Sequence, residues 1–148
     1  MTDRLDHDLL VLLHDVARLL RTRADRQARQ HALTRAQWMI LARLHRHGGS
    51  TQRALAELLE VEPITVGRLV DRLEARGLVE RRADPQDRRS WRLHLTPAAA
   101  PVLESIDAAH AALDAESTAG LPPPVREAMV AGLQAIKARL TGREPAAT

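Results

Sequence analysis

The chain has 148 residues, a length that fits one domain, and its 45% apolar and 28% charged composition is typical of globular rather than disordered proteins. It contains no cysteine, which excludes disulfides, cysteine-ligated zinc and a thiol redox switch. Phe and Tyr are absent, so Leu, Val, Ile, Ala and Met must build the core, and the strong helix formers Ala and Leu favour a mainly α protein.

The charge is segregated along the chain, although the formal net charge is only +3. Residues 18–53 hold nine arginines and one acidic residue, whereas residues 97–148 hold four basic and six acidic residues. Such segregation is expected either of a surface that meets an anionic partner or of an ordinary solvated helix face. The first residues show no signal-peptide pattern, and no apolar run approaches the roughly 18 residues of a membrane span. We therefore expect a cytoplasmic protein.

Apolar residues at three- and four-residue spacing predict two helices at the start of the chain. The first is expected over residues 4–29, with an apolar stripe made of Leu5, Leu9, Leu12, Val16 and Leu19. The second is expected to open at Thr34 and to run to about His47, because the two glycines that follow stop a helix.

Two further helices are expected next. Ser50 or Thr51 can cap a short helix over 52–59, whose inward residues would be Leu55, Leu58 and Leu59. Pro63 suits the first position of a helix over 63–76, where its missing N–H costs nothing. The buried face of this helix would consist of Val66, Leu69, Val70 and Leu73.

A β-hairpin is expected after that helix. Gly77 would end the helix in a left-handed conformation, with Leu78 folding back on the helix as in a Schellman motif. Strands are expected over 78–82 and 90–95, where apolar and polar residues alternate with a period of two. The polar residues 83–89 form the connecting loop.

The last part of the chain predicts two helices. Thr96 and Pro97 begin a helix that runs to about Thr118, with an early bend at Pro101. Three prolines then break the chain before a final helix over 124–141, whose apolar residues are Val125, Met129, Leu133, Ile136 and Leu140.

Residues 51–95 thus have the order of a helix-turn-helix followed by a β-wing, an arrangement in which the second helix enters the major groove of DNA. The outer face of the 63–76 helix carries Ile64, Thr65, Gly67, Arg68, Asp71 and Arg72. Arginine and threonine at such positions bind base edges or phosphates. Ile64 has two interpretations: contact with a thymine methyl group, or packing on the 52–59 helix.

Three arginines of this helix, Arg68, Arg72 and Arg76, follow one another at four-residue spacing. Like charges at this spacing cost about 0.2–0.5 kcal/mol per pair, which Asp71 and Glu74 offset in part. Such a row fits either a solvated face or a helix beside an anion, and the wing that follows favours the anion.

The wing loop ends in Asp87, Arg88 and Arg89. An arginine on a narrow hairpin suits a minor groove, where the potential is most negative. Asp87 either holds that arginine in place or stabilises the turn.

These residues resemble the core of the MarR (multiple antibiotic resistance regulator) family closely over 34–100. The resemblance is carried by LTRAQWMILARLHRHGGSTQRALAELLEVEPITVGRLVDRLEARGLVERRADPQDRRSWRLHLTPAA, above all by RLVDRLEARGLVERR, the DRR of the wing loop and LHLTPAA. The Asp-x-Arg pattern of the family's wing falls on Asp87 and Arg89, which implies that Arg89 is the minor-groove arginine. Ala99 replaces a common glycine, and Ala54 replaces the acid of a helix capping box.

The resemblance implies a mainly α winged helix-turn-helix fold with about six helices and a small β-hairpin wing. It implies a single domain over 1–148, with a DNA-binding core at 34–96, dimerisation helices at 4–30 and 97–141, and a flexible tail at 142–148. It further implies a ligand-responsive repressor that binds a pseudo-palindromic operator as a homodimer, with half-sites about one helical turn apart. The implied contacts with double-stranded DNA are Thr51, Gln52, Pro63, Ile64, Thr65, Gly67, Arg68, Arg72, Asp87, Arg88 and Arg89.

The family also implies a small aromatic or anionic effector. Its candidate site residues are His14, Arg18, Trp38, Met39 and His110. Each residue also has an interpretation without a ligand: Trp38 as an ordinary core residue, and the histidines as surface or interface residues. These interpretations are favoured over a role in effector binding. No cofactor or metal is expected, because His7 and His14 lie seven residues apart rather than at the four-residue spacing of helical zinc ligands.

Two other classes of function are alternatives to a DNA-binding regulator. An enzyme is not expected, because the sequence shows no nucleophile–base grouping, phosphate loop or metal motif. A winged helix that binds proteins in place of DNA is the alternative, and the retention of Arg68, Arg72 and Arg89 argues against it.

Overall fold

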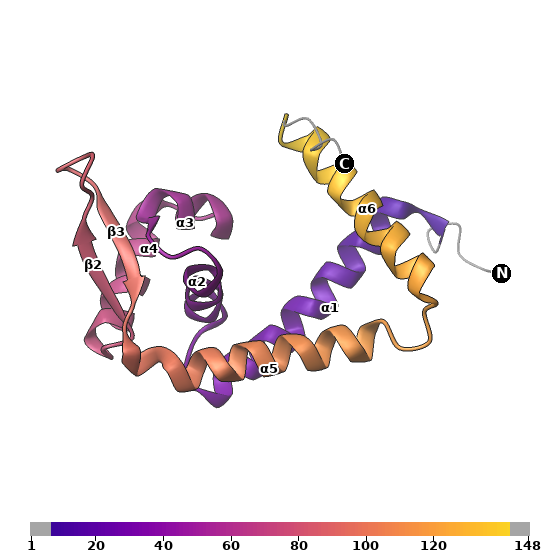
Figure 1. Cartoon of the computed structure of the whole chain (residues 1–148), viewed down its shortest axis with the longest axis horizontal. Coiled ribbons are helices and arrows are strands. Elements are labelled where there is room, and N and C mark those ends of the chain that lie inside the picture. Colours follow the sequence, from indigo (N-terminus) through magenta and orange to yellow (C-terminus); the bar gives the residue numbers. More distant parts are fainter. Residues whose placement is uncertain (1–6, 143–148) are drawn as a thin grey trace. The chain divides into compact units, whose positions relative to one another are not determined.

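The computed structural model describes residues 7–142 of the chain, and these form two compact units that divide between Ala109 and His110. Figure 1 shows the order of the elements along the chain. The predicted helix start at residues 4–6 and residues 143–148 of the tail predicted over 142–148 lie outside the described residues. Among residues 7–142, no helix is both long and apolar enough to cross a membrane.

Helix α1 (Leu9–Gln30) begins later than the apolar stripe predicts. Asp8 precedes it as an N-cap, and its carboxylate accepts hydrogen bonds from the backbone N–H groups of Leu10 and Val11. A cap that satisfies these N–H groups fixes where a helix begins, so the prediction of one continuous helix over 4–29 was wrong at Asp8.

Helices α2 (Arg35–Arg46) and α3 (Gln52–Leu59) both begin at the predicted threonine caps. Thr34 forms a capping box with Gln37, each side chain bonding the other residue's backbone N–H. The hydroxyl of Thr51 accepts from the N–H of Ala54.

Helix α4 (Pro63–Ala75) ends as predicted. Gly77 takes a φ of 69°, a left-handed conformation that glycine adopts without steric cost. Its N–H donates to the carbonyl of Glu74, and the N–H of Leu78 donates to that of Leu73. This pair of hydrogen bonds is the Schellman motif, and it turns the chain directly into the first long strand.

The wing belongs to a three-stranded antiparallel sheet in the order β1-β3-β2, not to an isolated hairpin. Strands β2 (Val79–Ala83) and β3 (Trp91–Leu95) pair along their whole length. The unpredicted strand β1 (Ser50–Thr51) pairs with β3. Two residues are too few to show a period of two, which is why the sequence pattern missed β1.

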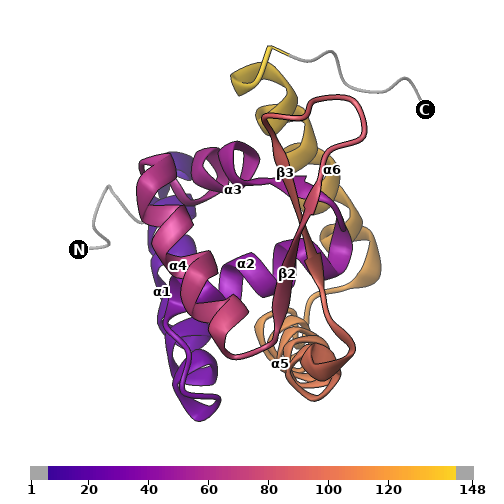
Figure 2. The same cartoon turned by 90° about the vertical axis from the view of Figure 1, so that its left-hand side faces the viewer.

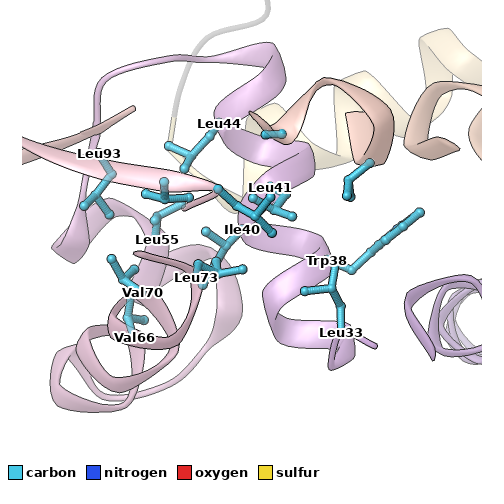
Figure 3. Packing of buried hydrophobic residues seen from close by; sticks show 14 of the residues in the cluster. Leu33, Trp38, Ile40, Leu41, Leu44, Leu55, Val66, Val70, Leu73 and Leu93 are labelled. Atoms are coloured by element: carbon cyan, nitrogen blue, oxygen red, sulfur yellow. The ribbon is translucent and has the colours of Figure 1, made fainter. Parts of the chain in front are cut away.

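The core of the first unit lies between α2, α3, α4 and the sheet (Figure 3). Its fully buried large side chains are Ile40, Leu41, Leu44, Leu55, Leu73, Leu93, Val66, Val70 and Val79. Trp38 is buried, whereas Met39 and Met129 are exposed. The inward position predicted for Leu58 was wrong, because Leu58 is exposed at the end of the short α3.

A single 3₁₀ turn, η2 (Pro97–Ala99), leads into α5 (Ala100–Ser117). Pro101 therefore stands in the first turn of α5 and not within a longer helix, so the predicted bend there is unnecessary. On the same unit, His45 Nε2 of α2 lies 2.8 Å from Asp107 Oδ2 of α5. This contact and the buried Val102 and Ile106 hold the first half of α5 to the winged core.

The second unit contains the end of α5 and α6 (Pro123–Leu140). Arg126 of α6 donates to both carboxylate oxygens of Asp114 at 3.0–3.1 Å. No residue of α6 is buried, and its exposed large apolar side chains are Val125, Met129, Val130, Leu133 and Leu140. Helix α6 thus presents an apolar stripe that the described residues do not cover.

Candidate nucleic-acid interface

Helices α3 and α4 and the long strands of the wing lie on the side of the chain that Figure 2 faces. The elements follow the order helix, tight connection, helix, wing, and the prediction of a mainly α fold with a small β-wing is confirmed. A helix-turn-helix of this kind offers its second helix to the major groove, so α4 is the candidate recognition helix.

The start of α4 is held by the start of α3. The side-chain amide of Gln52 donates to the carbonyl of Pro63 at 3.0 Å. Gly67 lies against the same side chain, and a Cβ at that position would stand 3.0 Å from Gln52 Nε2. Gly67 therefore permits a close approach of the two helices. Of the predicted DNA-contact residues, Gln52 and Gly67 have a structural role here, and Thr51 uses its hydroxyl as a helix cap.

The remaining predicted residues of α4 project outward. Ile64 is 66% exposed, so the alternative in which it packs on the neighbouring helix is wrong. Thr65, Arg68 and Arg72 are exposed beside it. Among the described residues, neither arginine has a hydrogen-bond or ion-pair partner. This face is therefore free to meet a ligand.

The predicted row of three arginines does not form as one surface. Arg76 turns away and donates to the carbonyls of Ala32 and His31 at 3.0 and 3.1 Å, closing the turn after α1. Ala32 has a φ of 53°, so this arginine stabilises an otherwise strained connection. The prediction of a single row was wrong because Arg76 binds residues more than forty positions away in the chain, and helical spacing does not reveal such contacts.

Asp71 and Glu74 do not offset the arginines of their own helix. Both carboxylates instead accept hydrogen bonds from Arg81 of β2, with the Asp71 contact at 2.6 Å. The guanidinium also approaches the carbonyl of Gly67 at 3.4 Å. Arg81 is only 22% exposed. It therefore fastens the wing to the recognition helix and offsets one of the two negative charges of Asp71 and Glu74, a role that the sequence analysis missed.

The base of the wing loop is built around Asp84, a buried acid. Its carboxylate accepts from the N–H of Gln86 and from Nε of Arg92, both at 2.9 Å. Arg92 also donates to the carbonyl of Gly49, which ties the loop to β1. The backbone N–H of Gln86, followed by the charge of Arg92, lowers the pKa of the Asp84 carboxyl below its usual 3.8, despite an opposing effect of burial.

Asp87 supports the turn and not a neighbouring guanidinium. Its carboxylate accepts from the backbone N–H of Arg89 at 3.0 Å, and its carbonyl accepts from Ser90. Of its two interpretations, the structure agrees with turn stabilisation. The side chains of Arg88 and Arg89 are exposed and form no ion pair with any described residue.

The predicted effector residues are not gathered into one cavity within the first unit. His14 and Arg18 are exposed on α1, and Nη2 of Arg18 lies 3.5 Å from Oδ1 of Asp15. Trp38 is 5% exposed and stacks on His31, with ring centroids 5.7 Å apart. Burial of this kind fits the core role that the sequence analysis favoured. His110 belongs to the second unit, where it is exposed.

An open groove of about 590 Å³ lies between α3 and the start of α4. Three of the residues that line it are glutamates, and the full lining is Arg53, Ala56, Glu57, Glu60, Val61, Glu62, Pro63 and Thr65. None of the predicted effector residues lines this groove. Glu60 has a φ of 54°, a left-handed conformation that disfavours any residue with a Cβ.

Comparison with known proteins agrees with this geometry. The model of the MarR family matches residues 33–91. The HTH-type transcriptional repressor NicR of Pseudomonas putida is 38% identical over 80 residues, covering 54% of this chain and 51% of NicR. This chain therefore aligns with about half the length of that curated relative.

Solved structures match over nearly the whole chain. The transcriptional regulator PA3341 is 34% identical, with a TM-score of 0.83, and the match covers 92% of this chain and 100% of that one. CouR from Rhodococcus jostii RHA1, solved with bound p-coumaroyl-CoA, is 27% identical with a TM-score of 0.76, and the match covers 91% of this chain and 95% of CouR.

Proposed function

This chain belongs to the MarR family, and we propose that it is a sequence-specific DNA-binding transcriptional regulator that acts as a dimeric, ligand-responsive repressor. MarR-family proteins are transcriptional regulators, and repression is the activity that NicR is named for. A regulator of this kind would work in the cytoplasm, with the DNA that it controls.

One observation carries the proposal: four exposed arginines without a partner among the described residues lie on two elements of one module. Arg68 and Arg72 project from α4, and Arg88 and Arg89 project from the wing loop. Guanidinium groups left unpaired on a rigid scaffold suit phosphates and the acceptor atoms of guanine. We assign Arg68 and Arg72 to the major groove and Arg89 to the adjacent minor groove, with Ile64 against a thymine methyl group.

Dimerisation follows from apolar faces that the single chain leaves uncovered. Helix α1 exposes Leu9, Leu10, Leu12, Val16, Leu19 and Leu20, and α6 buries no residue at all. Helices of this kind bury their stripes against a second copy. Two copies would present two α4 helices to a pseudo-palindromic operator with half-sites about one helical turn apart.

Ligand response is supported by the relative CouR, whose structure contains p-coumaroyl-CoA. In this chain we propose the five residues His14, Arg18, Trp38, Met39 and His110 as the effector contacts.

Fluorescence anisotropy with the upstream intergenic DNA of the gene tests this function. We expect binding that survives scrambled competitor DNA and weakens as salt rises. Replacing Arg68 with Ala should relax base preference by about 1–3 kcal/mol at one operator position. Equal affinity for intergenic and scrambled DNA, with capture of a protein partner, would favour the alternative winged helix that binds proteins.

A further inference from the structure

Trp91, the first residue of β3, is a large aromatic side chain that the wing leaves 53% exposed. Leu93, two residues further along the same strand, is fully buried. Single exposed apolar residues are common on protein surfaces, so exposure alone says little. The position of Trp91 relative to α4 and the wing loop is more informative.

The indole lies on the face of the sheet that looks toward α4. Residues directly opposite each other on antiparallel strands share a face, and so do alternate residues of one strand. Trp91 is opposite Ala83, and Leu93 is opposite Arg81. Because Arg81 reaches Asp71 on α4 from this face, Trp91 lies on the same side of the wing as the recognition helix.

Along the wing, Trp91 lies between the recognition helix and the wing loop. Arg81 and Leu93 form the pair beside α4, and Ala83 and Trp91 form the next pair outward. The loop that carries Arg88 and Arg89 begins immediately after Ala83. The small side chain of Ala83 cannot cover an indole ring, so the ring stays open on this face.

On the proposed function, α4 occupies a major groove and the wing loop the neighbouring minor groove, so a DNA strand must pass between them. We propose that Trp91 contacts the sugar–phosphate backbone of that strand. Its indole N–H donates to a phosphate oxygen, and its ring covers the adjoining deoxyribose. Tryptophan has a donor and no acceptor, which suits a phosphate. Such a contact positions the wing and carries no base preference.

Fluorescence tests the contact directly, because the chain has only two tryptophans. The W38F variant leaves Trp91 as the only one. Acrylamide should quench it readily in the free protein, since the side chain is half exposed, and saturating intergenic DNA should protect it. Saturation is measured separately by the anisotropy of labelled DNA. Unchanged quenching of Trp91 on saturated DNA would overturn the proposal.

Affinity measurements separate the hydrogen bond from the ring. W91F keeps an aromatic ring without the N–H, and W91A removes both. Neither variant should disturb the buried core, because Trp91 is exposed. We expect W91F to bind both intergenic and scrambled DNA about tenfold more weakly than wild type, and W91A to bind more weakly still. Tenfold corresponds to the lower end of the range for a hydrogen bond to a charged acceptor. Because no cation is lost, the dependence of log K on log salt should keep its slope.

The outcomes distinguish this inference from the function on which it rests. If wild-type protein showed no preference for intergenic DNA, the proposed function would fail, whatever Trp91 does. If wild type showed that preference and W91F bound equally tightly, the phosphate contact would be wrong. A changed ratio of intergenic to scrambled affinity would also overturn it, because that result means base reading.

Discussion

The ion pairs of Arg81 give the most demanding test of the site, because this one residue joins the wing to the recognition helix and offsets one of the two negative charges of Asp71 and Glu74. The substitution R81M removes the guanidinium and keeps most of the aliphatic stem, so packing along β2 is largely preserved. It leaves the carboxylates of Asp71 and Glu74 without their cation.

Two magnitudes follow from the structure. A hydrogen bond to a charged group contributes about 1.5–3 kcal/mol when shielded, but Asp71 is 65% and Glu74 41% exposed. Solvent screening reduces the expected loss in the free energy of unfolding to about 1 kcal/mol. Loss of the guanidinium makes this surface more negative by one charge, and one unit charge about 4 Å from a phosphate adds repulsion of about 1 kcal/mol in water-like surroundings. Operator affinity should therefore fall by about fivefold, and the loss should shrink as salt rises.

Urea denaturation measures the first effect and anisotropy at several salt concentrations measures the second. The double variant R81M/D71N provides the internal control. It removes the charge of Asp71, the more exposed of the two carboxylates that R81M leaves without their cation. We expect it to regain much of the lost DNA affinity while remaining less stable than wild type. The reasoning is refuted if R81M binds the operator as tightly as wild type at low salt, or if D71N gives no recovery.

Three further predictions concern single residues. R89A should weaken operator binding, most at A·T-rich flanks, and lower the salt slope by about 1, whereas R82A, an exposed wing arginine paired with Glu80, should change affinity much less. E60G should raise the free energy of unfolding by about 0.5 kcal/mol in thermal melts, because relief of left-handed strain exceeds the added chain entropy. The lowered pKa of Asp84 means that its carboxylate stabilises the fold above pH 3.8 and that this contribution is lost as pH falls through the lowered value. D84N should therefore flatten the acid limb of a stability–pH curve, and an unchanged limb would contradict the assignment.

Features that depend on neighbouring residues were readable from the sequence. The caps at Thr34 and Thr51 and the left-handed end at Gly77 each use hydrogen bonds within a few residues, so local residue types determine them. The cap at Asp8 was not predicted, because the spacing of an apolar stripe does not show which residue caps a helix. Strand β1 was missed because its pairing with β3 links residues about forty positions apart.

The candidate site was predictable in its position and less so in its internal roles. The outward face of α4 and the wing loop follow from helical and strand periods, and Ile64 and Arg68 are exposed as expected. Which residues are consumed by packing depends on tertiary contacts. Gln52 and Gly67 bring two helices together instead of facing outward. Only the short distance between these two residues in the folded chain reveals this role.

The arginines of the winged module divide into two groups, and the division explains why a chain of small net charge offers a positive surface. Arg76, Arg81 and Arg92 donate to carbonyls and carboxylates of distant segments and so determine the shape of the module. In doing so, Arg92 pairs with the acid at the base of the wing, and Arg81 offsets one of the two negative charges on the acids of α4. The unpaired arginines on α4 and the wing loop face outward without an ion pair to any described residue. The potential that a phosphate meets is thus produced as much by where the acids are held as by where the free arginines lie.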